Sequence, residues 1–306
     1  MAVIARVIGA GILSVLALGA LGGGAAWYFR GDRTRLTVVP PTLVGTAHVT
    51  GARLPPPPAH VIVVIEENKS YRNIVGNTSA PYLNSLIPHA AFFTHSYAIA
   101  HPSQPNYMAL FTGRVNSNGD GCPAVGIPLD TPNLASELRS AGRSFVGYAE
   151  SEPSQGFRGC FSDDSYGQKH APWAHFTNVT SAENTPYANF PTYAKLPTVS
   201  IVIPNLSDDM HSGSIRRGDA WLRRNIAPLL AWGATHNTLL IITWDESSAA
   251  IANHIPTFFV GPMVQPGRYA EVVSHYRVLR TIEDLYHLPH AGLSAKSTPI
   301  TDIWNR

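Results

Sequence analysis

Three apolar segments of the sequence end directly in acidic or amide side chains. Residues 61–65 are a continuous run of Val and Ile, and Glu66-Glu67-Asn68 follows at once. Such a run is typical of a strand that is buried on both faces, as in a parallel sheet. Residues 198–203 and 238–243 repeat the pattern and lead to Asn205 and Asp245. Because open α/β sheets build their sites at the carboxyl ends of their strands, the sequence predicts an α/β fold with a polar site at that edge.

Helical segments alternate with these strands. Gly142 follows the expected helix at 134–141, and glycine is typical of the position just after a helix. Alternating strands and helices predict a mostly parallel central sheet with helices on both faces, in three α/β/α layers. Residues 151–195 show no clear periodicity and are expected to form a long insertion beside the site. The expected strands are 61–65, 90–98, 144–148, 198–203, 238–243 and 257–260, and the expected helices are 80–86, 134–141, 219–232 and 276–286, with a further helix starting near 107–111.

The first 59 residues differ in character from the rest. Residues 7–29 contain no charged side chain and are long enough to span a bilayer. Two interpretations stay open: a cleaved export signal, or an uncleaved anchor that would associate the protein with the membrane. Both place the remaining chain outside the cytoplasm. Residues 31–59 form a Pro-rich linker, and residues 60–306 are expected to be one catalytic domain.

Composition narrows the classes of function. The 306 residues are 44% hydrophobic and 14% charged, which indicates a globular chain. The net charge is only +2 and the basic residues form no cluster, so nucleic acid is not an expected partner. The two cysteines, Cys122 and Cys160, lie in Gly-rich segments without a Cys-x-x-Cys pair. In an exported protein we expect them to form a disulfide.

Oxygen and nitrogen ligands recur after the strands. Glu67 and Asn68 follow the first strand, and Asp245 and Glu246 follow another. The remaining candidates are Asp209, His211 and His254, which comes eight residues after Glu246. Mixed O and N ligands suit one or two divalent ions such as Mg²⁺, Mn²⁺, Ca²⁺ or Zn²⁺. Asp208-Asp209 could instead cap a helix, whereas two adjacent carboxylates such as Asp245-Glu246 repel unless a positive charge lies between them.

A serine lies where it could act as a nucleophile. Ser103 lies between Pro102 and Pro105, just before the apolar residues 107–111 that begin a helix. Free N–H groups at a helix N-terminus favour anionic oxygens, which suits attack on phosphate. On its own, a serine between prolines is as well explained by a turn.

Together these motifs make the chain recognisable from about residue 60 to its end. It resembles the bacterial phosphoesterase family of secreted acid phosphatases and phospholipases C, within the alkaline-phosphatase superfamily. Among these it is most similar to the mycobacterial-type acid phosphatases that act on phosphoinositides. The motifs that carry the resemblance are Glu67-Asn68-Lys69-Ser70, residues 80–86 and 101–107, Tyr148-Ala149-Glu150, Pro204-Asn205 with Asp209-Met210-His211, residues 218–222, Thr243-Trp244-Asp245-Glu246, Asn253-His254-Ile255-Pro256 and residues 299–304.

The resemblance implies an alkaline-phosphatase-like fold and assigns roles to residues. It implies that Glu67, Asn68, Asp245 and Glu246 bind a metal together with Ser103, the nucleophile. Asp209, His211 and His254 match positions that bind a second metal or the substrate phosphate. Two departures from the family pattern stand out: Ser212 replaces a frequent acid after His211, and residues 247–252 lack the acidic residues that relatives can carry.

The expected reaction is metal-assisted phosphoryl transfer. Ser103 would attack in line, form a phosphoserine and release it to water. His101, His170 and His211 are candidates for the acid that protonates the leaving group. The expected substrate is a phosphate monoester on a small molecule or a lipid headgroup. The alternatives are a phospholipase C-type phosphodiesterase and an inactive, membrane-anchored binding protein.

Overall fold

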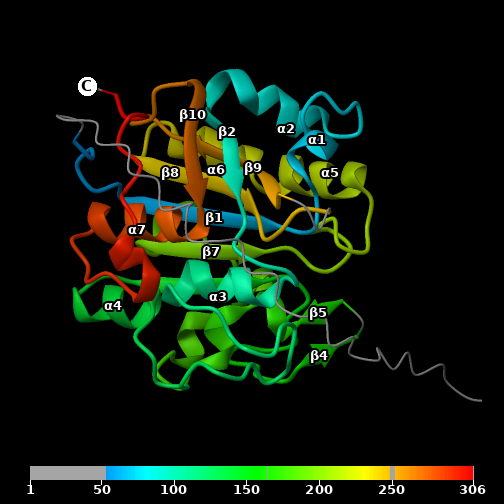
Figure 1. Cartoon of the computed structure of the whole chain (residues 1–306), viewed down its shortest axis with the longest axis vertical. Helices are drawn as coiled ribbons and strands as arrows, with labels where there is room; N and C mark the ends of the chain where they lie inside the picture. The colour runs from blue at the N-terminus through cyan, green and yellow to red at the C-terminus, as the bar shows by residue number, and fades with distance from the viewer. Residues whose placement is uncertain (1–52, 164, 249–251, 306) are drawn as a thin grey trace, which may run out of the picture. The chain divides into compact units, whose positions relative to one another are not determined.

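An eight-stranded sheet forms the centre of the computed structural model, which describes residues 53–163, 165–248 and 252–305 (Figure 1). The strand order is β10-β2-β9-β8-β1-β7-β3-β6, and β4 and β5 pair as a separate hairpin. The strands are β1 His60–Glu66, β2 Ala91–Tyr97, β3 Phe145–Ala149, β4 Phe161–Ser162, β5 Tyr166–Gly167, β6 Asn184–Pro186, β7 Val199–Ile203, β8 Thr238–Trp244, β9 His254–Val260 and β10 Gly267–Ser274. Only β9 runs antiparallel to its neighbours in this sheet, so the prediction of a mostly parallel sheet is confirmed.

Strand β1 lies between β7 and β8 and is parallel to both. The register pairs Glu66 with Trp244, so the residues that follow β1 and β8 leave the sheet at the same level. This register brings Glu67 and Asp245 to one edge of the sheet, as the apolar runs predicted.

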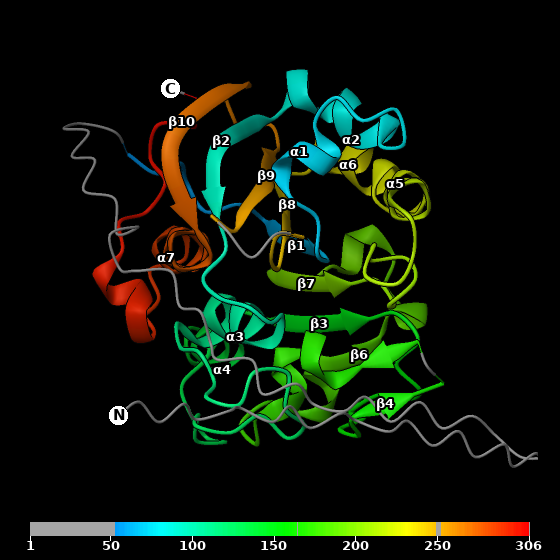
Figure 2. The same cartoon turned by 45° about the vertical axis from the view of Figure 1, so that its right-hand side comes forward.

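Helices cover both faces of the sheet because the β1 side chains alternate between two hydrophobic cores. Val61 and Val63 pack with residues of α3, α4 and α7, whereas Ile62 and Val64 pack with residues of α1, α2, α5 and α6. Figure 2 shows the two groups of helices on opposite sides of the strands. The predicted three-layer α/β/α arrangement is therefore confirmed. The helices are α1 Tyr71–Ile74, α2 Pro81–Leu86, α3 Gln104–Thr112, α4 Leu134–Ser140, α5 Ile215–Asn225, α6 Ala227–Gly233 and α7 His275–Leu285.

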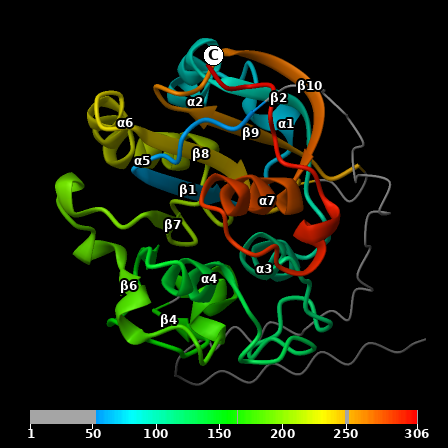
Figure 3. The same cartoon turned by 90° about the vertical axis from the view of Figure 1, so that its left-hand side faces the viewer.

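The insertion at 151–195 is built from short pieces. It contains the β4–β5 hairpin, several 3₁₀ turns, and β6, which pairs with β3 and extends the sheet by one edge strand. Figure 3 shows β4 and β6 at the end of the molecule that lies away from β10. Within the described residues, the 3₁₀ helices are η2 Ile87–His89, η3 Gln168–His170, η4 Pro172–His175, η5 Ser181–Glu183, η6 Tyr187–Asn189, η7 Tyr193–Lys195 and η8 Gly292–Lys296.

One predicted helix is wrong in its extent. The helix expected at 219–232 begins earlier, at Ile215, because the Ser214 side chain caps it by accepting the Arg217 N–H at 3.2 Å. It ends at Asn225, and a second helix starts at Ala227, where Pro228 occupies an early position that proline tolerates. The short α1 and the edge strand β10 were not predicted.

The N-terminal predictions fall largely outside the described residues. Residues 7–29, and most of the linker expected at 31–59, are not described. Within the part of the chain that the structure describes, no helix has the length and apolarity needed to cross a membrane.

Candidate active site

Three chain segments meet where β1, β7 and β8 end. The Glu67 N–H donates to the backbone oxygen of Asp209 at 2.7 Å, which ties the end of β1 to the loop after β7. The Asn68 N–H donates to Oδ1 of Asp245 at 2.9 Å, which ties it to the end of β8. Asn68 adopts a left-handed φ of 50°, a conformation that Asn tolerates better than most residues. The predicted ligands from these strand ends therefore lie together.

Ser103 is the residue just before α3 and is 1% exposed. Its Oγ lies 3.1 Å from Oε2 of Glu67 and 3.3 Å from Oε1 of Glu246, so the hydroxyl is between two carboxylates. Asn106, one turn into the helix, accepts the N–H groups of Ile99 and Ala100 at 2.9 Å and fixes the preceding turn. The structure thus places the predicted nucleophile beside the predicted ligands.

A second group of ligand atoms lies on the other side of Glu67. Glu67, His170 and Asp209 are buried, and each offers one ligand atom within 4.8 Å of the others. His170 Nε2 lies 3.1 Å from Oε1 of Glu67, and its Nδ1 lies 3.6 Å from Oδ2 of Asp209. Tyr107 from α3 donates its hydroxyl to Oε1 of Glu67, and its ring stacks on His170. The Glu67 carboxylate therefore faces Ser103 with one oxygen and His170 with the other.

The electrostatics of this site call for a positive charge. Burial and then the neighbouring Asp245 hold the pKa of Glu67 well above its usual range, and burial and then Glu246 do the same to the pKa of Asp245. Burial raises the pKa of Asp209 to about 8. Among the described residues, Oδ2 of Asp209 and Oδ2 of Asp245 have no hydrogen-bond partner although they are buried. Buried, unpartnered carboxylates beside an imidazole fit a divalent cation. Its charge would offset both the burial of the carboxylates and the repulsion between them.

The imidazole of His170 is in the form that binds metals. Its burial, and then the nearby Lys169, hold its pKa well below its ordinary value, so the ring is neutral. A neutral imidazole offers a nitrogen lone pair to a cation. From the sequence, His170 was predicted only as an acid.

Two lysines that sequence reasoning did not single out flank the carboxylates. Lys69 Nζ donates to the Met210 backbone oxygen at 2.6 Å. Lys169 Nζ pairs with Asp120 at 2.7 Å. The charges of both lysines interact with the Glu67 carboxylate. The charge of Lys169 lowers the pKa of Glu67 and so offsets part of the increase that burial causes. In the sequence, Lys69 follows Asn68 and Lys169 precedes His170, and this adjacency to candidate site residues could have identified both lysines.

The remaining predicted histidines lie in different surroundings. His101 Nδ1 is 2.5 Å from Oε2 of Glu246, so His101 belongs to the site. His211 follows Asp209, which accepts its N–H at 2.7 Å, and burial lowers the pKa of the His211 ring to about 4. His254 Nε2 lies 2.9 Å from the Thr94 backbone oxygen, and its ring stacks on Tyr71. These contacts connect His254 to β2 and α1, and its role as a ligand stays a prediction.

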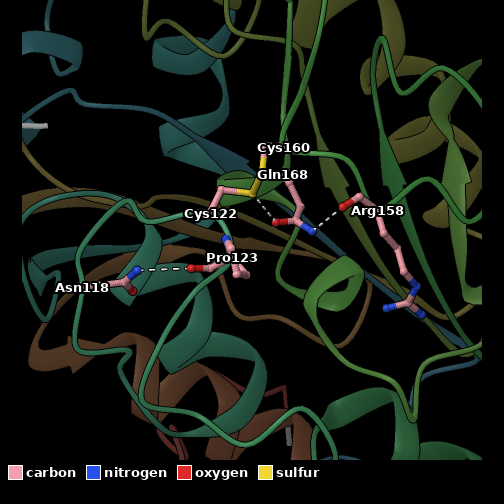
Figure 4. Close-up of a disulfide and its surroundings, with 6 residues drawn as sticks. All are labelled: Asn118, Cys122, Pro123, Arg158, Cys160 and Gln168. Carbon is pink, nitrogen blue, oxygen red and sulfur yellow. Dashed lines mark hydrogen bonds between the residues drawn. A yellow bond between two sulfur atoms is a disulfide. The ribbon is translucent and has the colours of Figure 1, made fainter. Parts of the chain in front are cut away.

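A disulfide holds the loops beside the site. Cys122 and Cys160 are bonded, as the sequence predicted, and join the loop after α3 to the insertion (Figure 4). The Gln168 amide lies against this bond: its Oε1 is 3.0 Å from Sγ of Cys122, and its Nε2 donates to the Arg158 backbone oxygen at 2.9 Å. Because Gln168 precedes Lys169 and His170 in η3, the disulfide supports the segment that brings both side chains to the site.

Comparison with known proteins agrees with this arrangement. The model of the Phosphoesterase family matches residues 77–289. The chain belongs to the phosphoesterase family. A phosphatidylinositol-3-phosphatase of Mycobacterium tuberculosis is 48% identical over 250 residues, which cover 80% of this chain and 83% of that protein. An acid phosphatase of Aspergillus fumigatus is 30% identical over 254 residues, which cover 74% of this chain but 54% of the fungal protein. As a phosphoesterase family member with phosphatase relatives, the chain is an enzyme that hydrolyses phosphate esters.

Solved structures confirm the fold. An alkaline phosphatase superfamily protein from Vibrio parahaemolyticus matches 83% of this chain and 72% of its own with a TM-score of 0.57 at 12% identity. A lipoteichoic acid synthase, LtaP, from Listeria monocytogenes matches 80% of this chain and 76% of its own with a TM-score of 0.58 at 12% identity. The predicted alkaline-phosphatase-like fold is therefore confirmed.

Proposed function

We propose that this phosphoesterase is an exported, metal-dependent phosphatase that hydrolyses phosphate monoesters through a phosphoserine on Ser103. The observation that carries the proposal is the position of the Ser103 hydroxyl, buried between the carboxylates of Glu67 and Glu246. A serine that served only as a turn residue would not need two buried acids at its oxygen, because their desolvation is costly.

The residues present fit a divalent metal, as the unpartnered buried oxygens indicate. Glu67, Asn68, Asp245 and Glu246 would hold it next to Ser103, in the roles that the family resemblance implies. Glu67, Asp209 and His170 would hold a second ion, and His254 is a further candidate from the family resemblance. When bound, the metal supplies positive charge that stabilises a serine alkoxide and the phosphate oxygens.

The protein side chains provide the remaining chemistry. Ser103 Oγ gives its proton to one of the adjacent carboxylates and bonds to phosphorus, while the bond from phosphorus to the leaving oxygen breaks. Lys69 and Lys169 add positive charge near the transferred group. The leaving alkoxide takes a proton from His101, which contacts Glu246, because burial lowers the pKa values of the other two candidates, His170 and His211. Water then attacks the phosphoserine and restores the hydroxyl.

We infer that the substrate class includes phosphoinositides. The support is the name of the relative from Mycobacterium tuberculosis, a phosphatidylinositol-3-phosphatase that is 48% identical to this chain over 250 residues. Hydrolysis of p-nitrophenyl phosphate, of its bis-ester and of a short-chain phosphatidylinositol 3-phosphate should be measured together. Turnover of the bis-ester alone would reject the monoesterase and favour a phospholipase C-type diesterase.

Export is the final part of the proposal. The disulfide supports an oxidising environment for residues 60–306, the proposed catalytic domain. We propose that residues 1–30 direct export, as a cleaved signal or as an anchor, and that residues 31–59 are the linker. Fractionation of producing cells, with sequencing of the mature N-terminus, distinguishes the two forms.

A trapping experiment tests the mechanism. Enzyme quenched in acid during turnover of a ³²P-labelled monoester should carry label on the peptide that contains Ser103. The Ser103→Ala variant should carry no label and lose about four or more powers of ten in kcat. Near-normal turnover by Ser103→Ala would overturn the assignment. Removal of the metal with a chelator should abolish turnover, and added divalent ions should restore it.

A further inference from the structure

Helix α5 presents a strongly basic surface. In its eleven residues, Arg216, Arg217, Arg223 and Arg224 are all exposed. Arg217 pairs with Asp208 at 2.8 Å, whereas no ion pair is formed by the other three within the described part of the chain. The acid on this helix, Asp219, is buried and accepts the N–H groups of Tyr82 and Leu83, so it does not offset the charge of the exposed face.

This helix begins at the edge of the active site. Ile215, its first residue, is four residues after His211, and Asp208, the partner of Arg217, directly precedes Asp209. Gly218 of this helix also lies close to the loop. A Cβ added to Gly218 would lie 2.9 Å from the backbone oxygen of Asp208. The first turns of α5 therefore adjoin the loop that carries the catalytic residues.

An exposed aromatic ring lies beside another part of the site. Phe161 of β4 is 60% exposed, the largest exposed fraction among the large hydrophobic side chains in the described residues. A Cβ placed on Gly167 would lie 3.8 Å from the Phe161 ring and 3.6 Å from Cγ of Lys169, so the ring and the lysine stem are neighbours. Phe161 is thus an apolar group next to a cationic residue of the site.

We propose that this edge of the molecule binds the surface of an anionic phospholipid bilayer, with the α5 arginines on lipid phosphates and Phe161 among the headgroups. Guanidinium groups bind phosphates in a planar, two-pronged geometry, and basic residues are attracted to the negative surface charge of an anionic bilayer. Apolar side chains such as Phe enter the boundary between headgroups and acyl chains in proteins that bind the bilayer surface. The proposal rests on the proposed function, because binding in this orientation brings Ser103 to a phosphorylated headgroup.

A bilayer fits this surface better than a protein partner does. The exposed basic residues lie on one helix, α5, and the exposed Phe161 lies on a separate strand, β4, so they form no continuous apolar surface. A protein interface usually has a continuous apolar core with charges at its rim. A fluid lipid surface needs no such complementary shape, because anionic lipids move to the cationic groups.

The first experiment measures binding locally, in the full chain, by hydrogen–deuterium exchange. Vesicles of phosphatidylcholine alone are compared with vesicles that also contain phosphatidylglycerol, and neither contains a phosphoinositide. The proposal predicts that peptides covering 161–167 and 215–225 gain protection only with the anionic vesicles. Equal protection with both vesicles, or none, would overturn it, as would protection without vesicles that rises with protein concentration and so indicates self-association.

The second experiment uses charge-matched variants. Arg216→Gln/Arg223→Gln/Arg224→Gln should slow hydrolysis of phosphatidylinositol 3-phosphate in anionic vesicles about tenfold, and Phe161→Ala should also slow it. Hydrolysis of soluble p-nitrophenyl phosphate by the arginine variant should change less than about twofold. The control Arg53→Gln/Arg114→Gln/Lys296→Gln removes the same charge from other exposed positions. Equal losses in both triple variants would show a general charge effect and overturn the proposal.

The two experiments separate this inference from the proposed function. Protection by vesicles without phosphoinositide does not depend on catalysis, and it should persist in the Ser103→Ala variant. If the enzyme proves inactive on phosphoinositides but α5 is still protected, the proposed substrate fails and the bilayer surface stands. If activity on the soluble ester is normal but α5 is not protected, only the bilayer inference fails.

Discussion

The carboxylate of Asp120 joins Lys169 to the helix that carries Ser103. Its Oδ2 accepts the Lys169 ammonium at 2.7 Å, and its Oδ1 accepts the N–H of Gln104, the first residue of α3, at 2.9 Å. The lysine therefore has a fixed position relative to the nucleophile, although the two are far apart in the sequence. A cation that is already in place loses little entropy when phosphate binds.

The substitution Asp120→Asn should impair catalysis without unfolding the protein. Asparagine can still accept the Gln104 N–H, but it loses the charge-assisted bond to Lys169. We expect kcat/KM for p-nitrophenyl phosphate to fall about tenfold to a hundredfold, with an unchanged melting temperature. Asp130→Asn, at an exposed position of the same loop, is the matched control and should have little effect. Equal activity of the two variants would mean that the ion pair is not part of substrate binding.

Removal of the disulfide should cost stability. Cys122 and Cys160 are 38 residues apart, and in the chain-entropy model closing a loop of this length contributes about 4 kcal/mol. The double variant Cys122→Ser/Cys160→Ser should therefore unfold at lower denaturant concentration. Its kcat/KM should fall as well, because Gln168, beside the disulfide, directly precedes Lys169. The wild type under reducing conditions should behave like the double variant, and a variant with full stability and activity would contradict this role.

Tyr107 should act through Glu67. Its hydroxyl donates to Oε1 of Glu67, so Tyr107→Phe leaves that buried oxygen with one donor fewer. We expect kcat to fall about tenfold, far less than for Ser103→Ala. Tyr148→Phe removes the hydroxyl of another largely buried tyrosine, on β3, and should change kcat little. Because Tyr107 and His170 share Glu67, the losses in the double variant with His170→Ala should not be additive.

Glu137 should make the stability of the protein depend on pH. Burial and then the nearby Glu283 raise the pKa of Glu137, on α4, to about 8. The folded state therefore favours the protonated form, and stability is lost as the pH rises from the unfolded value near 4.5 through about 8. Glu137→Gln should be more stable than the wild type at pH 8 by on the order of 2 kcal/mol, and similar to it at pH 4.5. Urea unfolding at both pH values measures this, and the exposed Asp130→Asn should show no such difference.

The sequence predicted the parts of the site that follow strong strands. A run of Val and Ile identified β1, a run of Leu and Ile identified β8, and parallel pairing then required that Glu67 and Asp245 meet. The turn before an apolar helix likewise predicted where Ser103 lies. In each case a local sequence pattern predicted the strand or helix, and the pairing of the strands then brought the side chains at their ends together.

The sequence could not predict what depends on irregular structure. His170 and Lys169 reach Glu67 through a 3₁₀ turn in a segment without periodicity, and contacts distant in the sequence place them there. The edge strand β10 alternates weakly and carries charges, so its pattern did not stand out. The break between α5 and α6 depends on Pro228, whose early position in a helix is as compatible with a helix start as with a loop.

The position of the insertion at the margin of the sheet has an evolutionary consequence. Residues 151–195 add β6 beside β3, and among the described residues no further strand lies beyond it, so this segment pairs with the sheet through β3 alone. It also supplies His170, Lys169 and Phe161. Substitutions in this one segment can therefore change what surrounds Glu67, while β1, β7 and β8, which pair without any of its residues, keep the acids beside Ser103 together.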